Sequence, residues 1–433
     1  MEAYRGSVLH FLEDPDQCVE AESYAYFEDG LLLVEHGQVV AAGSYEELHA
    51  QLPTGLSPVD YSGQLILPGF VDNHIHYPQT EMIAAYGEKL LQWLETYTFP
   101  TESQFSDFEY ASAIAERFLD TLLANGTTTA MVYGTVHPQS VDAFFEACEK
   151  RDLRMIAGKP MMDRNSPDYI LDTAQSSYDD SKALIERWHK RGRLAYAVTP
   201  RFAPSSSPEQ LALAGKLLEE YPDVYMQTHI AENTDEVAWV AELFPEAQNY
   251  LDTYDRVGLL GPRSVFAHCI HLQDAEWQRL AETNSRIAFC AASNLFLGSG
   301  LFKLERAVQE GVCVGMGTDV GGGNTFSTLQ NLADAYKIQQ LNDYRLTPFK
   351  AFYLATLGGA RSLDCDKVIG NFLPGKEADF VVLDRAATDF LAFRMAHCKS
   401  LLEELFVLVT LGDDRAVRAT YAAGRCVHER GRE

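Results

Sequence analysis

The stretch FVDNHIHYPQ, residues 70–79, follows an apolar run and places two histidines one residue apart. In an extended strand, residues two positions apart project to the same face, so His74 and His76 can point into one site. A lone histidine is usually a satisfied side chain without a chemical task. Whether this pair has a task depends on what the other strands bring beside it.

From residue 70 onward, short apolar runs alternate with longer amphipathic stretches, as they do in βα units. Helix patterns separate the runs; in residues 205–221, Ser207 can cap a helix whose first position is Pro208. The strand candidates, eight in number, are FVDNHIH, GTTTAMVYG, LRMIAGKPMM, LAYAVTPRF, VYMQTHIAE, SVFAHC, IAFCAAS and VCVGMGTD. Eight such units predict a (β/α)8 TIM barrel, whereas seven would fit a doubly wound sheet.

The two ends of the chain have a different pattern, in which short strand-like runs alternate with turns. EDG at 28–30 and EHG at 35–37 are flanked by strand-like residues and predict turns, and LPGKEAD and AAGR do the same near the C-terminus. Terminal β segments that bracket a different middle often pair with each other. We therefore predict an α/β fold with two domains. They are a metal-dependent barrel over 69–365 and a small β-sandwich domain composed of 1–68 and 366–433.

The bulk composition excludes several classes of partner. The chain has 62 acidic against 35 basic residues, a formal charge of -27, which would repel nucleic acid and an anionic membrane. No apolar run is long enough to span a bilayer, and the N-terminus lacks the pattern of a signal peptide. Eight cysteines occur without a C-x-x-C pair, so we expect reduced, mostly buried thiols and a cytoplasmic protein.

The strand candidates end in residues that bind metals. Barrel enzymes build their sites at the C-terminal ends of the strands. Here the first strand ends in His74 and His76, the fifth in His229, the sixth in His268, and Asp319 ends the eighth. Imidazoles with a carboxylate suit zinc, or iron of similar charge, in an open catalytic site. The alternative is that these polar residues reached a polar barrel mouth by chance.

Glu232 lies three residues beyond His229 in THIAEN. At a strand end that turns into a loop, this spacing can bring the carboxylate over the metal, where it could move protons between water and a substrate nitrogen. Taken alone, a glutamate on a loop is usually a solvated charge. Its neighbour His229 makes the catalytic interpretation the stronger one.

Together, PGFVDNHIH, THIAEN, FAHC, GTDVGGG and the bracketing β segments resemble the metal-dependent amidohydrolase superfamily over nearly the whole chain. Narrower motifs, QWLETYTFPTE, NGTTTA, TPRFAPSSS and GNFLPGKEADFVVLD, resemble its guanine deaminase branch. The resemblance implies one Zn2+ per chain, with Fe2+ also possible. Its implied ligands are His74, His76, His229 and Asp319, with His268 close to the metal. Many relatives use a carbamylated lysine after the fourth strand; TPRFAPS has none, which favours a single ion.

The same resemblance implies a catalytic role for Glu232, Asp319 and His268 in deaminating guanine to xanthine and ammonia. The implied substrate-binding residues are Gln79, Arg201, Phe202, His229, Glu232 and Trp93. Arg201 offers a fork of donors suited to a purine carbonyl oxygen. Phe202 can equally be plain core packing, and Trp93 can belong to a loop over the ligand or to a buried helix face. The resemblance also implies a homodimer.

Other functions remain open on the sequence alone. The same ligands would serve a deaminase of an oxidised purine such as 8-oxoguanine, of an adenosine-like nucleoside or of a pterin, or a chlorohydrolase. A non-catalytic barrel scaffold would lack metal ligands, and none is missing here. The glycines of GTDVGGGNT resemble a phosphate loop, yet no lysine follows. We interpret them as room for the backbone beside the metal.

Overall fold

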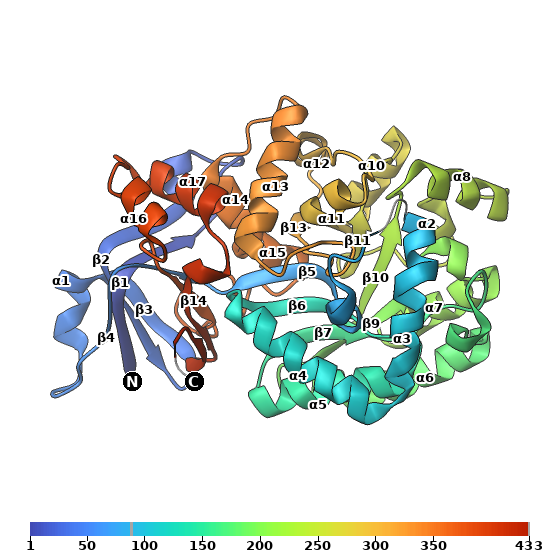
Figure 1. The fold of residues 1–433 in the computed structure, drawn as a ribbon, viewed down its shortest axis with the longest axis horizontal. Helices are drawn as coiled ribbons and strands as arrows, with labels where there is room; N and C mark the ends of the chain where they lie inside the picture. Colours follow the sequence, from blue (N-terminus) through green and yellow to red (C-terminus); the bar gives the residue numbers. More distant parts are fainter. Residues whose placement is uncertain (87–89, 432–433) are drawn as a thin grey trace.

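The computed structural model describes residues 1–86 and 90–431. Its N- and C-terminal strands meet in one mixed sheet beside a parallel barrel (Figure 1). Helices surround the barrel strands, so the α/β TIM-barrel prediction is confirmed. The side chains of Leu90 and Leu91, which belong to the predicted buried helix face around Trp93, lie outside the description.

The terminal sheet has the strand order β16-β15-β14-β4-β1-β2-β3. Strands β1 and β4 are parallel, and the other neighbours are antiparallel. The sheet curls on itself, because Val34 and Val39 from one end share an apolar cluster with Phe380 and Tyr421 from the other. The strand bounds are β1 (Glu2–Phe11), β2 (Tyr24–Glu35), β3 (Gln38–Ser44), β4 (Val59–Pro68), β14 (Phe380–Leu383), β15 (Val417–Ala422) and β16 (Arg425–Glu429).

Three of the four predicted turns are confirmed, and one is wrong. LPGKEAD turns at Pro374 and Gly375, with φ of 87° at Gly375. His36 and Gly37 connect β2 to β3 with φ of 53° and 76°, and Ala423 and Gly424 connect β15 to β16 with φ of 46° and 73°. Such left-handed pairs are typical of tight hairpins. EDG, in contrast, lies inside β2. A Cβ on Gly30 would lie 2.7 Å from Val8 Cγ2, so this glycine lets β1 approach closely and does not turn the chain.

Each of the eight predicted runs contains a barrel strand. The strands are β5 (Phe70–His76), β6 (Thr127–Tyr133), β7 (Arg154–Gly158), β9 (Ala195–Pro200), β10 (Tyr225–Ile230), β11 (Ser264–His268), β12 (Arg286–Phe289) and β13 (Val314–Met316), with the short β8 (Pro160–Met161) paired to β9. Their neighbours run in chain order and parallel, as in a βα barrel.

The first and last strands meet at their carboxyl ends. The Asp319 N–H donates to the His74 carbonyl (2.8 Å), and the His76 N–H donates to the Val320 carbonyl (2.9 Å). The buried carboxylate of Asp72 also accepts hydrogen bonds from the backbone N–H groups of His74 and Thr318, each at 3.1 Å. These bonds hold His74, His76 and Asp319 at one rim.

The longer helices follow the barrel strands. Ser207 caps α7 through the Gln210 N–H, and Pro208 is its first residue, as predicted. The helices are α4 (Phe108–Ala124), α5 (Pro138–Arg151), α6 (Ala174–Trp188), α7 (Pro208–Glu220), α8 (Thr234–Leu243), α10 (Asp274–Glu282), α11 (Ala291–Phe296), α12 (Leu304–Glu310), α13 (Thr328–Leu341), α14 (Pro348–Ala355), α15 (Leu357–Ser362), α16 (Asp389–Met395) and α17 (Leu401–Leu411), with the short α1 (Tyr45–Leu48) and α9 (Asp252–Asp255). The sequence did not predict α16 and α17, which interrupt the C-terminal strands.

A helical segment over residues 90–102 lies on the side of the barrel away from the terminal sheet (Figure 1). It consists of α2 (Leu90–Trp93), a π-helical turn η4 (Leu94–Thr98) and α3 (Phe99–Glu102). Its apolar side chains pack in one cluster with residues from three barrel loops: Met82, Trp93, Leu94, Phe99, Val136, Met162 and Ile170. The cluster fixes this segment against the barrel mouth. Among the described residues, no helix combines the length and apolarity needed to cross a bilayer.

Candidate active site

Four side chains that the sequence predicted as metal ligands converge at the barrel mouth. His74 and His76 come from β5, His229 comes from β10, and Asp319 follows β13. His76 Nε2 lies 3.3 Å from His74 Nε2 and 3.3 Å from His229 Nε2. Asp319 Oδ1 lies 3.2 Å from His74 Nε2 and 3.3 Å from His76 Nε2. The ligand atoms of the four residues all lie within 4.8 Å of one another, close enough to hold one ion.

The three imidazoles favour the neutral state that metal binding requires. Burial lowers the pKa of His74 to about 4, and burial also lowers the pKa values of His76 and His229. His229 Nδ1 lies 2.6 Å from the Arg201 carbonyl oxygen, so it carries the proton and its Nε2 has a free lone pair. His229 Nε2 therefore presents its lone pair towards His76 Nε2, 3.3 Å away, where one cation can be bound by both rings. The donor set therefore fits a metal ion.

A second possible group of metal ligands combines His74 and Asp319 with His268 and Cys290. Its ligand atoms also lie within 4.8 Å of one another. Burial raises the pKa of the Cys290 thiol well above its usual value. Its Sγ lies 3.5 Å from the Ala288 carbonyl oxygen. A protonated thiol is a poor metal ligand, so the grouping of three histidines and Asp319 is the better site.

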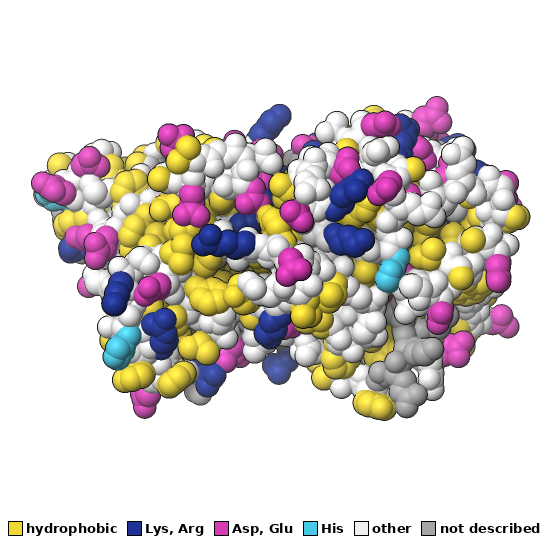
Figure 2. All heavy atoms as spheres, turned by 90° about the horizontal axis from the view of Figure 1, so that it is seen from above, with side chains coloured by type: hydrophobic (Ala, Val, Ile, Leu, Met, Phe, Trp, Pro, Cys, Tyr) yellow, Lys and Arg dark blue, Asp and Glu magenta, His cyan; other side chains and the backbone are white. Residues whose placement is uncertain are grey.

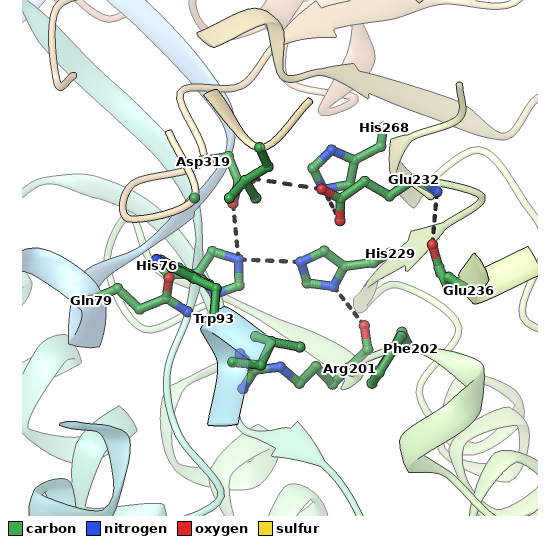
Figure 3. A pocket seen from close by; sticks show the side chains of 13 residues that line it. His76, Gln79, Trp93, Arg201, Phe202, His229, Glu232, Glu236, His268 and Asp319 are labelled. Carbon is green, nitrogen blue, oxygen red and sulfur yellow. Dashed lines mark hydrogen bonds and ion pairs between the residues drawn. The ribbon is translucent and has the colours of Figure 1, made fainter. Parts of the chain in front are cut away.

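Glu232 and His268 lie over this site (Figure 3). His268 Nε2 is 3.5 Å from Glu232 Oε2 and 3.8 Å from Asp319 Oδ2, and it has no hydrogen-bond partner among the described residues. Burial raises the pKa of the Glu232 carboxyl. Burial acts to lower the pKa of His268, but the charges of Glu232 and Asp319 outweigh it and leave that pKa raised. A buried acid and a buried imidazole thus share one proton-transfer region.

The backbone at two of these strand ends adopts an uncommon conformation. His268 has φ of 71° and Asp319 has φ of 51°, in the left-handed region that L residues rarely occupy. Such positions cost of order 1 kcal/mol or more and cluster at functional sites. Here they turn both side chains from the strand direction into the mouth.

The predicted substrate-binding residues line one pocket with these groups. The pocket encloses about 450 Å³ of empty space, part of which is open to solvent. It is lined by His76, Gln79, Trp93, Leu94, Arg201, Phe202, His229, Glu232, Glu236, His268, Leu297, Asp319 and Gly322. His74 lies deeper, behind the metal site. The structure therefore brings every predicted site residue to one place, while their roles remain predictions.

Trp93 and Phe202 each line the pocket and also pack against other apolar side chains, so the two alternatives that the sequence left open for each residue are both realised. Trp93 packs in the apolar cluster of the helical segment and also lines the pocket. Its indole Nε1 is buried and has no hydrogen-bond partner in the part of the chain that the structure describes. Phe202 lines the pocket and packs edge-on against Trp239 at 6.4 Å between ring centroids.

The glycine run after Asp319 gives space to the backbone, as predicted. A Cβ on Gly323 would lie 1.9 Å from the Thr318 carbonyl oxygen, and a Cβ on Gly322 would lie 3.0 Å from Asp319 Oδ2. The Gly321 N–H donates to Gln79 Oε1 at 3.1 Å. This run therefore shapes the metal side of the pocket.

The sequence did not predict the residues that form hydrogen bonds or ion pairs with the predicted site residues. Asn294 Oδ1 lies 3.0 Å from His268 Nδ1, and Ser299 Oγ donates to Glu232 Oε1 at 2.9 Å. Glu236 accepts the Glu232 N–H at 2.9 Å, and Glu102 pairs with Arg201. The capping pattern of Asn233 and Glu236, and the position of Glu102 inside the quoted TYTFPTE motif, were available signals. No local pattern marks Asn294 or Ser299.

Comparison with known proteins now identifies the class. Residues 65–427 match the profile of the amidohydrolase family, so the chain belongs to that family, whose members generally depend on a metal ion. The chain is 58% identical to the guanine deaminase of Escherichia coli (strain K12), over 99% of this chain and 98% of that one. These matches confirm the family resemblance drawn from the strand-end motifs.

Solved structures agree with this relationship. A structure of E. coli guanine deaminase matches with a TM-score of 0.97 at 57% identity, covering 100% of both chains. Guanine deaminase from C. acetobutylicum, solved with guanine bound in the active site, matches with a TM-score of 0.88 at 29% identity, over 99% of this chain and 100% of that chain.

Proposed function

We propose that the chain is a zinc-dependent hydrolase that deaminates guanine to xanthine and ammonia in purine catabolism. The observation that carries the proposal is the position of the Glu232 carboxylate and the His268 imidazole directly over the cluster of three histidines and Asp319. The full-length similarity to guanine deaminases supports guanine as the substrate. The related amines named above, and chlorinated rings, are the alternatives.

His74, His76, His229 and Asp319 would hold one zinc ion. When bound, zinc supplies a water whose pKa falls towards 7, from about 16 in bulk water. Asp319 Oδ2 and His268 Nε2 lie 3.8 Å apart and face the same space, so they can orient that water. His268 is itself held by Asn294 on its other ring nitrogen.

Glu232 carries the proton transfers. Its buried carboxylate takes a proton from the attacking water and delivers it to the ring nitrogen beside the carbon that bears the exocyclic amine. The water oxygen adds to that carbon as a hydroxyl, and Asp319 or Glu232 then takes the hydroxyl proton and delivers it to the departing amine. The carbon–nitrogen bond breaks, ammonia leaves, and the ring carbon keeps the oxygen as a carbonyl. Acid and base assistance of this kind contributes about 100- to 10,000-fold.

The substrate assignment is tested by recording ammonia release from a panel of compounds. Guanine, 8-oxoguanine, adenine, adenosine and an aminopterin ring are each incubated with the purified protein. We expect guanine to have the largest kcat/KM, because the donor groups of Arg201 and Gln79 line the pocket together with the aromatic rings of Trp93 and Phe202. A larger kcat/KM for a pterin or an adenine compound would move the substrate to that class.

The metal assignment predicts about one equivalent of zinc per chain in protein purified without chelators. Removal by a chelator should abolish ammonia release, and added Zn2+ should restore it. His76→Ala should lose the ion, whereas His271→Ala should keep it, because His271 contacts the Ser299 carbonyl and lies outside both possible ligand groupings. Protein with no metal and chelator-resistant activity would contradict the assignment.

The remaining proposals concern the cellular location of the protein and its binding partners. A cytoplasmic location is supported by the buried cysteines Cys148, Cys269, Cys290 and Cys365, which form no disulfide within the described chain. Lys and Arg side chains are scattered among acidic and hydrophobic ones on the face drawn in Figure 2. With the charge of -27, this supports a partner set without nucleic acid or membrane. The homodimer and the domain limits stay expectations.

A further inference from the structure

The buried carboxylate of Glu102, at the end of α3, contacts two of the proposed substrate-binding residues. It accepts hydrogen bonds from Arg201 Nη1 (2.6 Å), Arg201 Nη2 (3.1 Å) and Gln79 Nε2 (3.0 Å). The Glu102 side chain is 2% exposed and that of Arg201 is 4% exposed. The ring centroid of Phe99 lies 5.7 Å from the guanidinium carbon of Arg201. The quoted TYTFPTE motif therefore contacts Arg201 through two of its side chains.

Glu102 determines which groups Gln79 and Arg201 can offer to a ligand. Gln79 Oε1 accepts the Gly321 N–H, and its Nε2 donates to Glu102. A flipped amide would set oxygen against carboxylate and N–H against N–H, so the orientation is fixed. The amide keeps one free N–H. Of the five N–H groups of a guanidinium, two donate to Glu102, so three remain. The guanidinium can then offer the pocket donors only, and Gln79 offers a donor beside a carbonyl oxygen that already accepts the Gly321 N–H.

Glu102 also determines the net charge of the pocket wall that Arg201 and Gln79 form. A buried guanidinium without a counterion is costly and would attract an anion to the pocket. The bidentate pair with Glu102 cancels that charge while leaving the remaining donors in place. A neutral ring whose facing edge carries acceptors, such as a carbonyl oxygen and a ring nitrogen, matches a wall of donors without net charge.

We propose that Glu102 is a positioning residue that sets the specificity of the pocket for neutral heterocycles with an acceptor edge. It acts through Arg201 and Gln79 and does not touch the ring. The proposal rests on the proposed function, because it takes the pocket beside the metal ligands as the substrate site.

The test compares Glu102→Gln and Glu102→Asp with the wild-type enzyme in its zinc-loaded form. Glu276→Gln is the matched control, because Glu276 is equally buried but accepts backbone N–H groups of Leu251 and Gln273 at α10, outside the pocket. For Glu102→Gln, we expect KM for guanine to rise about 10- to 100-fold, with kcat within about 3-fold. Glu102→Asp restores the charge and should recover part of the loss. The control should lower the unfolding temperature without a change in KM.

A second readout uses purine-6-carboxylate, which places an anion where guanine has its carbonyl oxygen. Its inhibition constant, or its thermal shift on the zinc-loaded protein, should improve about 10-fold in Glu102→Gln relative to wild type, because Arg201 has lost its counterion. Glu102→Asp should stay close to wild type. This binding readout does not depend on turnover, so it still reports on Glu102 if wild-type protein releases no ammonia from guanine and the proposed function fails.

Two outcomes overturn the proposal. One is a Glu102→Gln enzyme whose kcat falls while KM and anion binding stay unchanged. The other is a variant that resembles Glu276→Gln, with lower thermal stability and unchanged kinetics. If Glu102→Gln does not fold, Glu102→Asp decides: a carboxylate shortened by one carbon must raise KM, and an unchanged KM overturns the assignment.

Discussion

Glu232→Gln is expected to lower kcat for guanine by about 100- to 10,000-fold, the range that general acid and base catalysis contributes. The amide preserves the size of the side chain and can still accept from Ser299 Oγ, which lies 2.9 Å from Glu232 Oε1. It cannot take up and release a proton at neutral pH. The measurement is single-turnover and steady-state ammonia release at saturating guanine.

Metal content and unfolding temperature are measured on the same preparations, since the variant should keep its zinc and its fold. Glu276→Gln serves again as a buried carboxylate outside the pocket, with turnover expected near that of wild type. Near-normal kcat in a zinc-loaded Glu232→Gln enzyme would place the proton transfers elsewhere, with Asp319, the carboxylate of the proposed metal site, as the next candidate.

Arg201→Ala is expected to lower kcat/KM for guanine by about 30- to 5,000-fold, equal to about 2 to 5 kcal/mol for truncating a buried charged partner. Arg201 lines the pocket, and the N–H groups that Glu102 leaves free suit the carbonyl oxygen of guanine. Adenine has an amine at that position, so donor would face donor and the wild-type enzyme should discriminate strongly against it. Arg201→Lys should recover only part of the loss, because an ammonium lacks the planar fork.

Part of the Arg201→Ala loss could come from Glu102, which the substitution leaves as an unpaired buried anion. The double variant Arg201→Ala, Glu102→Gln removes both charges and separates this effect from recognition. We expect its stability to recover while its kcat/KM for guanine stays low. Equal kcat/KM for guanine in Arg201→Ala and wild type, or a wild-type preference for adenine, would contradict the assignment of Arg201.

The clustering of the proposed metal ligands was predictable because each of them follows a short apolar run. His74, His76, His229 and Asp319 occupy the carboxyl ends of runs whose composition predicts buried strands, and parallel strands of a barrel present those ends at one rim. Counting the runs was enough to bring the four residues together. The φ values of His268 and Asp319, 71° and 51°, could not be read from propensity, since non-glycine residues rarely adopt that region, although Asp and His do so more often than most.

The supporting residues were not predictable in the same way. Glu102 and Arg201 are 99 positions apart, and Glu232 and Ser299 are 67 apart, so no local pattern relates their side chains. Their pairing depends on where the segment 90–102 packs on the barrel mouth, through the apolar cluster that contains Trp93 and Met162. The helices α16 and α17 were not predicted because they lie between strand-like segments, and the sequence prediction treated the whole C-terminal segment as β-strands.

The sequence by itself determined the class of fold and which strand ends carry histidine or carboxylate, because these depend on residue type and on the period of the apolar runs. The ligand set and the proton carrier stay predictions built on those positions. Only the tertiary structure decided the polarity and charge of the substrate wall. A buried guanidinium and an amide can each face a ligand in several ways, and the choice here depends on the Glu102 carboxylate and the Gly321 N–H that three-dimensional packing brings to them. Hydrogen bonds in a dry pocket are short-ranged and directional, so specificity at this level belongs to contacts between distant parts of the chain.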